Sequence, residues 1–188
     1  MEHNINIQIL LEQIAVLDDK LAFERVFYIY FKKLHRFAVA IVKDRQAAEE
    51  VVSDVFVYLW KNRSKLLEIE NLNNYIYIAT KNMAIRRRTK LNATREFNVE
   101  EIAIEPAVLD ANSPEQLFLN KELTRRYEAA INALPVRCQT IYRLAKQDGL
   151  RYKEIAAILN ISVKTIDAQM AVALRKITQA VRFVTEIR

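Results

Sequence analysis

Chain breakers are scarce in this sequence, and that scarcity limits the folds it can adopt. Its 188 residues include one glycine and three prolines, the residue types that most often interrupt helices and form tight turns. A β-sandwich needs many such turns, so the composition favours long helices. Hydrophobic residues make up 52% of the chain and charged residues 28%, so it can fold around a core and is not a disordered tail. The sequence therefore predicts an all-α protein.

The last third of the chain has the pattern of a helix-turn-helix of the DNA-binding type. Ile155 and Leu159 form an apolar stripe, and Ala156 is small where two helices must cross closely. Asn160 is the turn residue, and Ser162 is the cap. Asn160 stands where a residue that accepts positive φ is needed, and Ser162 can N-cap the next helix. Apolar spacing alone would also suit an ordinary αα-hairpin. The small residue, the turn and the cap together favour DNA binding.

The second helix of this motif exposes the face that would read DNA, because a major groove is wide enough to admit a helix. That face carries Lys164, Thr165, Asp167, Ala168 and Gln169. Phosphate would repel Asp167, although a carboxylate can accept a hydrogen bond from cytosine. Gly149, the only glycine of the chain, stands at the start of the motif. We expect it in the left-handed conformation that ends the preceding helix.

Helical periodicity also runs from about residue 20 to residue 90. An aromatic stripe at helical spacing is interpreted as core; it comprises Phe23, Val26, Phe27, Tyr30, Phe31 and Leu34. The next helix spans 47–63, with Asp44 as its cap. The residues predicted to face inward are Val51, Val55, Tyr58 and Leu59. The acidic outer edge of the helix is predicted to comprise Glu49, Glu50, Ser53 and Asp54.

A third helix is predicted over residues 75–90, with Asn71 or Asn73 as its cap. Its end is basic and carries Lys81, Arg86, Arg87, Arg88 and Lys90. The helix dipole favours cations at that end in any protein. However, Tyr75 and Tyr77 lie upstream beside Asn82, and aromatic rings next to cations are what single-stranded nucleic acid needs. One of the two rings could instead belong to the core.

The helical pattern breaks after residue 90, where the charge turns acidic. We interpret residues 91–112 as a linker between two small helical domains. Ser113, Pro114 and Glu115 restart a helix as cap, first-turn proline and early acid. Residues 1–19 are predicted to form a short amphipathic helix packed on the body of the protein.

Bulk properties narrow the function. The net charge of +6 suits a polyanionic partner. A single cysteine, Cys138, allows no internal disulfide and is expected to be a buried, inert thiol. No apolar stretch is long enough to span a membrane, and no leader is evident. Because no metal-ligand cluster or glycine-rich phosphate loop occurs, we expect no metal, cofactor, small-molecule substrate or catalytic residue.

The chain resembles the extracytoplasmic-function (ECF) class of bacterial RNA polymerase sigma factors. In the first half the resemblance rests on AAEEVVSDVFVYLW and NYIYIATKNMAIRRR, and in the second on INALPVRCQTIYRLAKQDGLRYKEIAAILNISVKTI. It implies a first domain over 20–90 that binds the clamp helices of the polymerase's largest subunit and melts the −10 promoter element. It implies a second domain over 113–188 whose helix-turn-helix binds the −35 element.

The resemblance also implies roles for individual residues. The polymerase-binding residues would be Glu50, Ser53 and Asp54. The melting and −10 residues would be Tyr75, Tyr77, Lys81, Asn82, Arg86, Arg87 and Arg88. The −35 residues would be Arg151, Lys153, Ser162, Lys164, Thr165, Ala168 and Gln169. Family members are often held by a membrane-bound anti-sigma factor, and they act in the cytoplasm.

The sequence departs from the family pattern at several of these positions. Tyr75 stands where Trp is common, Arg86 where Asp is frequent, and Gln169 where Arg or Lys is usual. Tyr75 keeps a ring for stacking, whereas the other two leave the promoter preference open. Tyr in place of Trp, together with the SVKT sequence, is similar to Bacteroidetes-like members.

Two other functions are consistent with parts of the sequence. A stand-alone helix-turn-helix regulator would bind duplex DNA as a dimer, and its first domain would be a sensor or a dimer interface. Such a regulator gives no reason for aromatic and basic residues to follow an acidic helix. An enzyme would need a catalytic constellation, and His3 and His35 lie in no recognisable motif.

Overall fold

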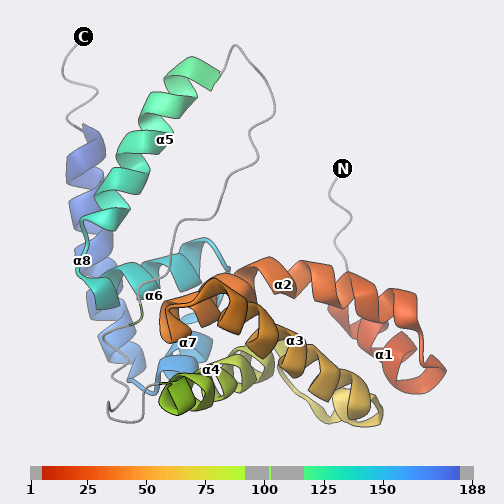
Figure 1. Ribbon diagram of the computed structural model, residues 1–188. Coiled ribbons are helices and arrows are strands. Elements are labelled where there is room, and N and C mark those ends of the chain that lie inside the picture. The colour runs from red at the N-terminus through yellow and green to blue at the C-terminus, as the bar shows by residue number, and fades with distance from the viewer. Residues whose placement is uncertain (1–5, 92–101, 103–116, 183–188) are drawn as a thin grey trace. The chain divides into compact units, whose positions relative to one another are not determined.

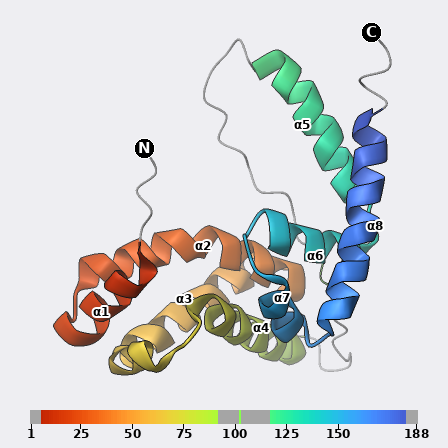
Figure 2. The same ribbon diagram turned by 180° about the vertical axis from the view of Figure 1, so that it is seen from behind.

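The computed structural model describes residues 6–91, 102 and 117–182 of the chain (Figures 1 and 2). Within those residues every regular element is a helix, which confirms the predicted all-α class. The chain divides into two compact units, Met1–Phe97 and Asn98–Arg188. The division falls inside the predicted linker, and the predicted N-terminal segment belongs to the first unit.

Over residues 6–91, the first unit contains four α-helices and one 3-10 helix. They are α1 (Ile7–Leu17), α2 (Lys20–Val42), α3 (Arg45–Lys61), η1 (Arg63–Glu68) and α4 (Leu72–Leu91). Short polar side chains cap the starts of these α-helices. Asp19 accepts hydrogen bonds from the first turn of α2, and Asp44 accepts one from Ala47 N at 2.6 Å. Asn71, the first of the two predicted caps, accepts one from Asn74 N at 2.9 Å.

Helix α2 is the centre of the first unit, because α1, α3 and α4 all pack against it. The side chains of Leu34, Phe37 and Ile41 on α2 are fully buried, and so are those of Val52 on α3 and Ile76 on α4. Fully burying such a side chain stabilises the fold by about 1.5–3 kcal/mol. The unit therefore has one apolar core, with α1 packed on it through Leu10, Leu11 and Ile14.

The predicted aromatic stripe divides between the core and a shallower layer. Val26, Tyr30 and Leu34 are buried as expected. Phe23, Phe27 and Phe31 are half-buried and form a continuous row of rings with Phe56 and Trp60 of α3. Adjacent centroids in this row lie 4.8–6.0 Å apart, which is the usual range for aromatic pairs.

One inward residue of α3 was predicted wrongly. Val51, Val55 and Leu59 are buried, and their four-residue spacing defines the apolar line of the helix. Tyr58 lies beside that line and is 46% exposed. Its ring instead faces a groove on the surface of this unit.

The second unit contains α5 (Leu117–Asn132), α6 (Val136–Lys146), α7 (Tyr152–Leu159) and α8 (Val163–Arg182). Helix α8 packs against the other three, as Figure 2 shows most clearly for α5 and α6. Pro135 directly precedes α6. Arg143 of α6 is fully buried and donates hydrogen bonds to Glu128 at 3.1 Å and Asn132 at 2.9 Å on α5.

Two residues of the predicted linker are described: Leu91, which is the last residue of α4 in the first unit, and Ile102, which belongs to the second unit. Ile102 is fully buried, and its carbonyl accepts a hydrogen bond from the Thr140 hydroxyl of α6. The rest of the predicted linker lies outside the described residues, as do Ser113, Pro114 and Glu115, where a helix was expected to restart. This part of the chain therefore contributes a core residue as well as a connection.

Candidate nucleic-acid interface

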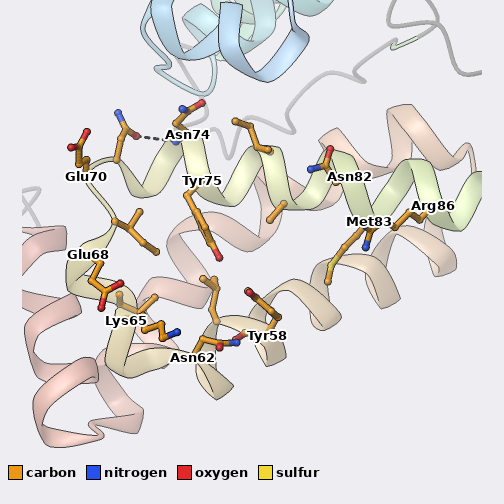
Figure 3. Close-up of a pocket in the computed structure, with 16 residues that line it drawn as sticks. Tyr58, Asn62, Lys65, Glu68, Glu70, Asn74, Tyr75, Asn82, Met83 and Arg86 are labelled. Atoms are coloured by element: carbon orange, nitrogen blue, oxygen red, sulfur yellow. Dashed lines mark hydrogen bonds between the residues drawn. The ribbon is translucent and has the colours of Figure 1, made fainter.

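A groove of about 870 Å³ opens on the first unit between η1 and α4 (Figure 3). Residues of η1 and the segment after it form one wall, and α4 forms the other. Tyr58 and Asn62, at the end of α3, lie between them. The charged and polar residues along the walls are Lys65, Glu68, Glu70, Asn71, Asn74, Asn82 and Arg86. The groove thus combines aromatic, amide and charged groups on one accessible surface.

Tyr75 is the aromatic ring at the centre of this groove. It is half-buried and points from α4 toward Tyr58 and Asn62. Partial burial raises the pKa of Tyr75, and a hydrogen bond with Tyr58 adds to the increase. The phenol is therefore neutral at physiological pH, which leaves a flat, uncharged ring that a nucleobase can stack on.

Tyr77 has the opposite environment, which corrects its predicted role in DNA contact. Its side chain is 1% exposed, and its ring packs on Phe37 of α2 with centroids 5.3 Å apart. Positions 75 and 77 are about 200° apart around a helix, so a groove on one side of α4 leaves the other ring facing the core. Tyr77 is a core residue and is not available for stacking on DNA.

The basic end of α4 is distributed over several environments. Arg86 is exposed and lines the groove together with Asn82. Arg87 forms an ion pair with Glu50 of α3, and Arg88 donates to the Ile41 carbonyl at 3.4 Å. Lys81 is half-buried, and this burial lowers its pKa. Of the predicted melting residues, the structure brings Tyr75, Asn82 and Arg86 together in the groove.

The predicted polymerase-binding edge lies on the exposed side of α3. Glu50, Ser53 and Asp54 are all solvent-exposed. A second hollow of about 240 Å³ joins this edge to the end of α4, lined by Glu50, Asp54, Arg86, Arg87 and Lys90 among others. The Glu50–Arg87 pair was not predicted, because the two residues are 37 positions apart and no local pattern connects them.

The second unit contains the predicted helix-turn-helix, formed by α7 and α8, which meet at a bend of 110°. Asn160 has φ of 55° and Gly149 has φ of 76°, so both are left-handed as predicted. The Ile161 amide donates to the Ala156 carbonyl at 3.0 Å across the turn. Ser162 Oγ accepts from the Thr165 amide at 3.0 Å, which confirms the predicted cap.

The outward residues of α8 differ in their freedom to contact DNA. Lys164, Asp167 and Ala168 are exposed, whereas Thr165 and Gln169 are half-buried. The Thr165 hydroxyl lies 2.8 Å from the Ser162 hydroxyl. The side chains of Arg151 and Lys153, at the start of α7, are exposed. The Arg151 main-chain amide donates to Glu154 at 2.6 Å, which fixes the start of this helix.

Cys138 contributes to the core behind this motif. It is fully buried, and its thiol donates to the Gln169 carbonyl at 3.2 Å. Burial raises the pKa of this thiol, so the thiolate is disfavoured. The position and protonation of Cys138 are those of a structural residue, as the sequence predicted.

The described residues show no metal site and no single membrane-spanning helix. No group of three or more His, Cys, Asp or Glu side chains there could hold a metal ion. No single described helix is long and apolar enough to cross a membrane. The bent pair Tyr152–Leu159 and Val163–Ala180 is long and apolar enough when the two helices are taken together, by length and composition only.

Sequence reasoning missed one wall of the groove. Lys65, Glu68 and Glu70 were assigned no role, because six residues of 3-10 helix show no hydrophobic period long enough to detect. The only available signal was their position between two predicted helices, where charged residues follow an exposed turn. That signal does not distinguish a binding wall from an ordinary loop.

Two family profiles match the chain, one on each unit. Residues 29–94 match Sigma-70 region 2, and residues 124–177 match Sigma-70, region 4. The chain is 25% identical over 171 residues to the RNA polymerase sigma-H factor of Pseudomonas aeruginosa, covering 87% of this chain and 88% of that protein. It is 27% identical over 131 residues to the ECF RNA polymerase sigma-E factor of Escherichia coli K12, covering 70% and 64%.

Two solved structures share the fold. One is CnrH in complex with the cytosolic domain of CnrY, at 17% identity and a TM-score of 0.50, covering 92% of this chain and 94% of CnrH. The other is the sigma factor RpoE in complex with the anti-sigma factor NepR from Bartonella quintana. It has 19% identity and a TM-score of 0.51, covering 85% of this chain and 96% of RpoE.

Proposed function

We propose that this chain, which carries the sigma-70 region 2 and region 4 domains of a sigma factor, belongs to the ECF class and starts transcription at specific promoters. It binds core RNA polymerase, recognises the −10 and −35 elements and opens the DNA. One observation carries the proposal: region 2 presents the Tyr75 groove beside basic residues, while region 4 presents a separate helix-turn-helix. The Bacteroidetes-like sequence pattern at Tyr75 suggests the kind of bacterium involved.

Region 2 supplies the contact with polymerase. The exposed edge of Glu50, Ser53 and Asp54 on α3 meets basic residues on the clamp helices of the largest polymerase subunit. Complementary charge of this kind accelerates and orients association. The protein acts where the polymerase transcribes, in the cytoplasm.

Region 2 also opens the promoter through the groove. Separating the strands costs about 1.4 kcal/mol for each base-pair step on average. Stacking a freed base on an aromatic ring returns roughly 1–3 kcal/mol, and Tyr75 is the ring placed for this. Asn82 supplies an amide for the base edge, and Arg86 supplies charge for a phosphate. Arg87 and Arg88 contribute further positive charge close by.

Region 4 places α8 in the major groove of the −35 element. Lys164 and Ala168 are exposed on this helix, and Thr165 and Gln169 flank them. Arg151, Lys153 and Ser162 lie around the start of α7 and the turn, where they reach the phosphate backbone. Phosphate contacts of this kind fix the register without reading sequence.

An anti-sigma factor is the expected regulatory partner. The solved structures with this fold are complexes, CnrH with the cytosolic domain of CnrY and RpoE with the anti-sigma factor NepR. A protein that covered region 2 or region 4 would block contact with polymerase or promoter. A membrane-bound anti-sigma factor would connect this chain to a signal from outside the cell.

The decisive experiment is transcription in vitro with core polymerase on a genomic library, followed by permanganate footprinting of unpaired thymines. Tyr75→Ala should reduce strand opening while leaving assembly with polymerase intact, because the lost stacking is worth roughly 1–3 kcal/mol per base. Tyr28→Ala is the matched control, since Tyr28 is 69% exposed on α2 and outside the groove. An unchanged bubble in the Tyr75 variant would contradict the assignment of the ring.

The alternative function is a dimeric helix-turn-helix regulator. It predicts that the chain sediments as a dimer and binds duplex promoter DNA tightly without polymerase. The Tyr75 groove favours the sigma factor, because a regulator of closed duplex DNA has no use for a ring that stacks on an unpaired base. Failure to bind core polymerase or to yield run-off RNA from any template would favour the regulator.

A further inference from the structure

An ion pair connects the end of α1 to the start of η1, the 3-10 helix that forms one wall of the groove. Asp18 follows α1 in the left-handed conformation, with φ of 53°. Arg63 is the first residue of η1. Both carboxylate oxygens of Asp18 accept hydrogen bonds from the Arg63 guanidinium, one from Nε and one from Nη2 at 3.0 Å. This two-point geometry is the strong form of an Arg–carboxylate pair.

The Arg63 guanidinium is also held on its other sides. It lies over the Trp60 ring, 4.8 Å from the ring centroid, which is within the range of a cation–π interaction. Its Nη1 atom donates to the Trp60 carbonyl at 3.2 Å. The hydrogen bonds from Arg63 lower the pKa of Asp18, so the carboxylate stays ionised. Arg63 is therefore fixed against α3 and α1 together.

η1 needs such external support. A 3-10 helix has poor hydrogen-bond geometry and is rarely stable alone. No side-chain cap begins this one, and Leu66 is its only buried residue. Helix α1 packs directly against it. The position of η1 therefore depends on α1 and on the Asp18–Arg63 pair rather than on its own backbone.

We propose that α1 and Asp18 form a positioning element for the groove: by fixing Arg63, they set the place of the η1 wall opposite Tyr75 and so determine which unpaired base the groove accepts. The inference rests on the proposed function, because it assumes that the groove holds a base. It assigns a role to the N-terminal helix α1, which packs against α2 and η1. Asp18 acts through Arg63 and is a positioning residue.

Two variants test this element with little disturbance elsewhere. Asp18→Asn removes the charge but keeps the left-handed backbone, which Asn tolerates well. Arg63→Lys keeps the positive charge but cannot form the two-point pair. Glu12→Gln is the matched control, because Glu12 is an exposed acid on the same helix. The double variant, with both Asp18→Asn and Arg63→Lys, measures whether the two residues act as one unit.

The first measurement is tryptophan fluorescence of the free protein. Trp60 is the only tryptophan, so its emission reports the guanidinium stacked on it. The second is the affinity of holoenzyme, assembled with core polymerase, for four fork DNAs that differ only in the unpaired −10 base. We expect both single variants to shift the emission and to reduce the preference for the best base by about twofold to fivefold. Binding to core polymerase should be unchanged, and the double variant should lose no more than either single one.

The outcomes separate this inference from the proposed function. If wild-type holoenzyme distinguishes the four bases but Asp18→Asn distinguishes them equally well, the positioning role is overturned and the sigma-factor function stands. Unchanged Trp60 emission in Asp18→Asn, or an equal loss in Glu12→Gln, would also overturn it. If wild-type holoenzyme shows no dependence on the unpaired base, the proposed use of the groove fails, and the inference fails with it.

Discussion

Two tyrosines of α4 show how a shift of two positions changes the role of a residue. Tyr75 is half-buried in the groove, and Tyr77 is 1% exposed against Phe37. The sequence shows an aromatic pair beside a basic run, and it predicts that one of the two rings could belong to the core. It could not decide which one, because the position of α2 relative to α4 determines the buried side, and that position is not a local property.

This difference in burial should give the two substitutions effects of different size on stability. Tyr77→Ala should lower the free energy of unfolding by about 3–5 kcal/mol, as removal of a large core ring usually does. Tyr75→Ala should cost much less, because its ring is only partly buried. Urea denaturation followed by circular dichroism measures both. Equal losses in the two variants would show that the assignment of Tyr77 to the core is wrong.

At the scale of elements, turn and cap chemistry was the most predictable part of the fold. Gly149, Asn160, Ser162 and Asp44 were each assigned from local rules, and each has the predicted conformation or hydrogen bond. Such residues act on backbone groups two to four positions away, so the sequence contains the whole interaction. η1 was not predicted, because tertiary contacts with α1 hold it.

The proposed polymerase-binding edge of α3 gives a prediction about a single helix face. Asp54→Lys should weaken retention of core polymerase by about fivefold or more, since an exposed ion pair contributes up to about 1 kcal/mol and reversal adds repulsion. Asp54 is the cleaner position, because Glu50 also pairs with Arg87 within the same unit. Glu24→Lys on α2 is the control, with the same change at another exposed acid. Retention measured on immobilised polymerase should fall only in the Asp54 variant.

Helix α8, the proposed DNA-reading helix, gives a second prediction at this scale. Lys164 is exposed in its first turn, where a phosphate contact is expected. Lys164→Ala should weaken upstream DNA binding about equally across sequences and reduce the salt slope by about one. Holoenzyme affinity measured over a range of salt concentrations tests this. A loss confined to one base position would instead make Lys164 a base-reading residue.

At the scale of the whole chain, the division into two units bears on how the protein would select a promoter. Sequence reasoning placed the junction over residues 91–112 from the change to acidic charge, and the observed division between Phe97 and Asn98 lies within it. Ile102 could not have been assigned to the second core, because the apolar residues around it do not follow helical spacing. Each unit carries one of the two proposed DNA-binding surfaces, so we expect the covalent connection to make the two surfaces act together.

The contribution of the covalent link between the two units to transcription can be measured. In general, joining two binding modules by a short linker gives the second binding event an effective concentration of about millimolar. We therefore expect fragments 1–97 and 98–188 to be helical by circular dichroism, with the first retained by core polymerase. Mixed at micromolar concentration as separate chains, they should give far less run-off RNA than the intact chain, because the second fragment must then bind at its own low concentration. Equal transcription from the mixture would mean that the −35 contact contributes little, and that region 2 selects the promoter by itself.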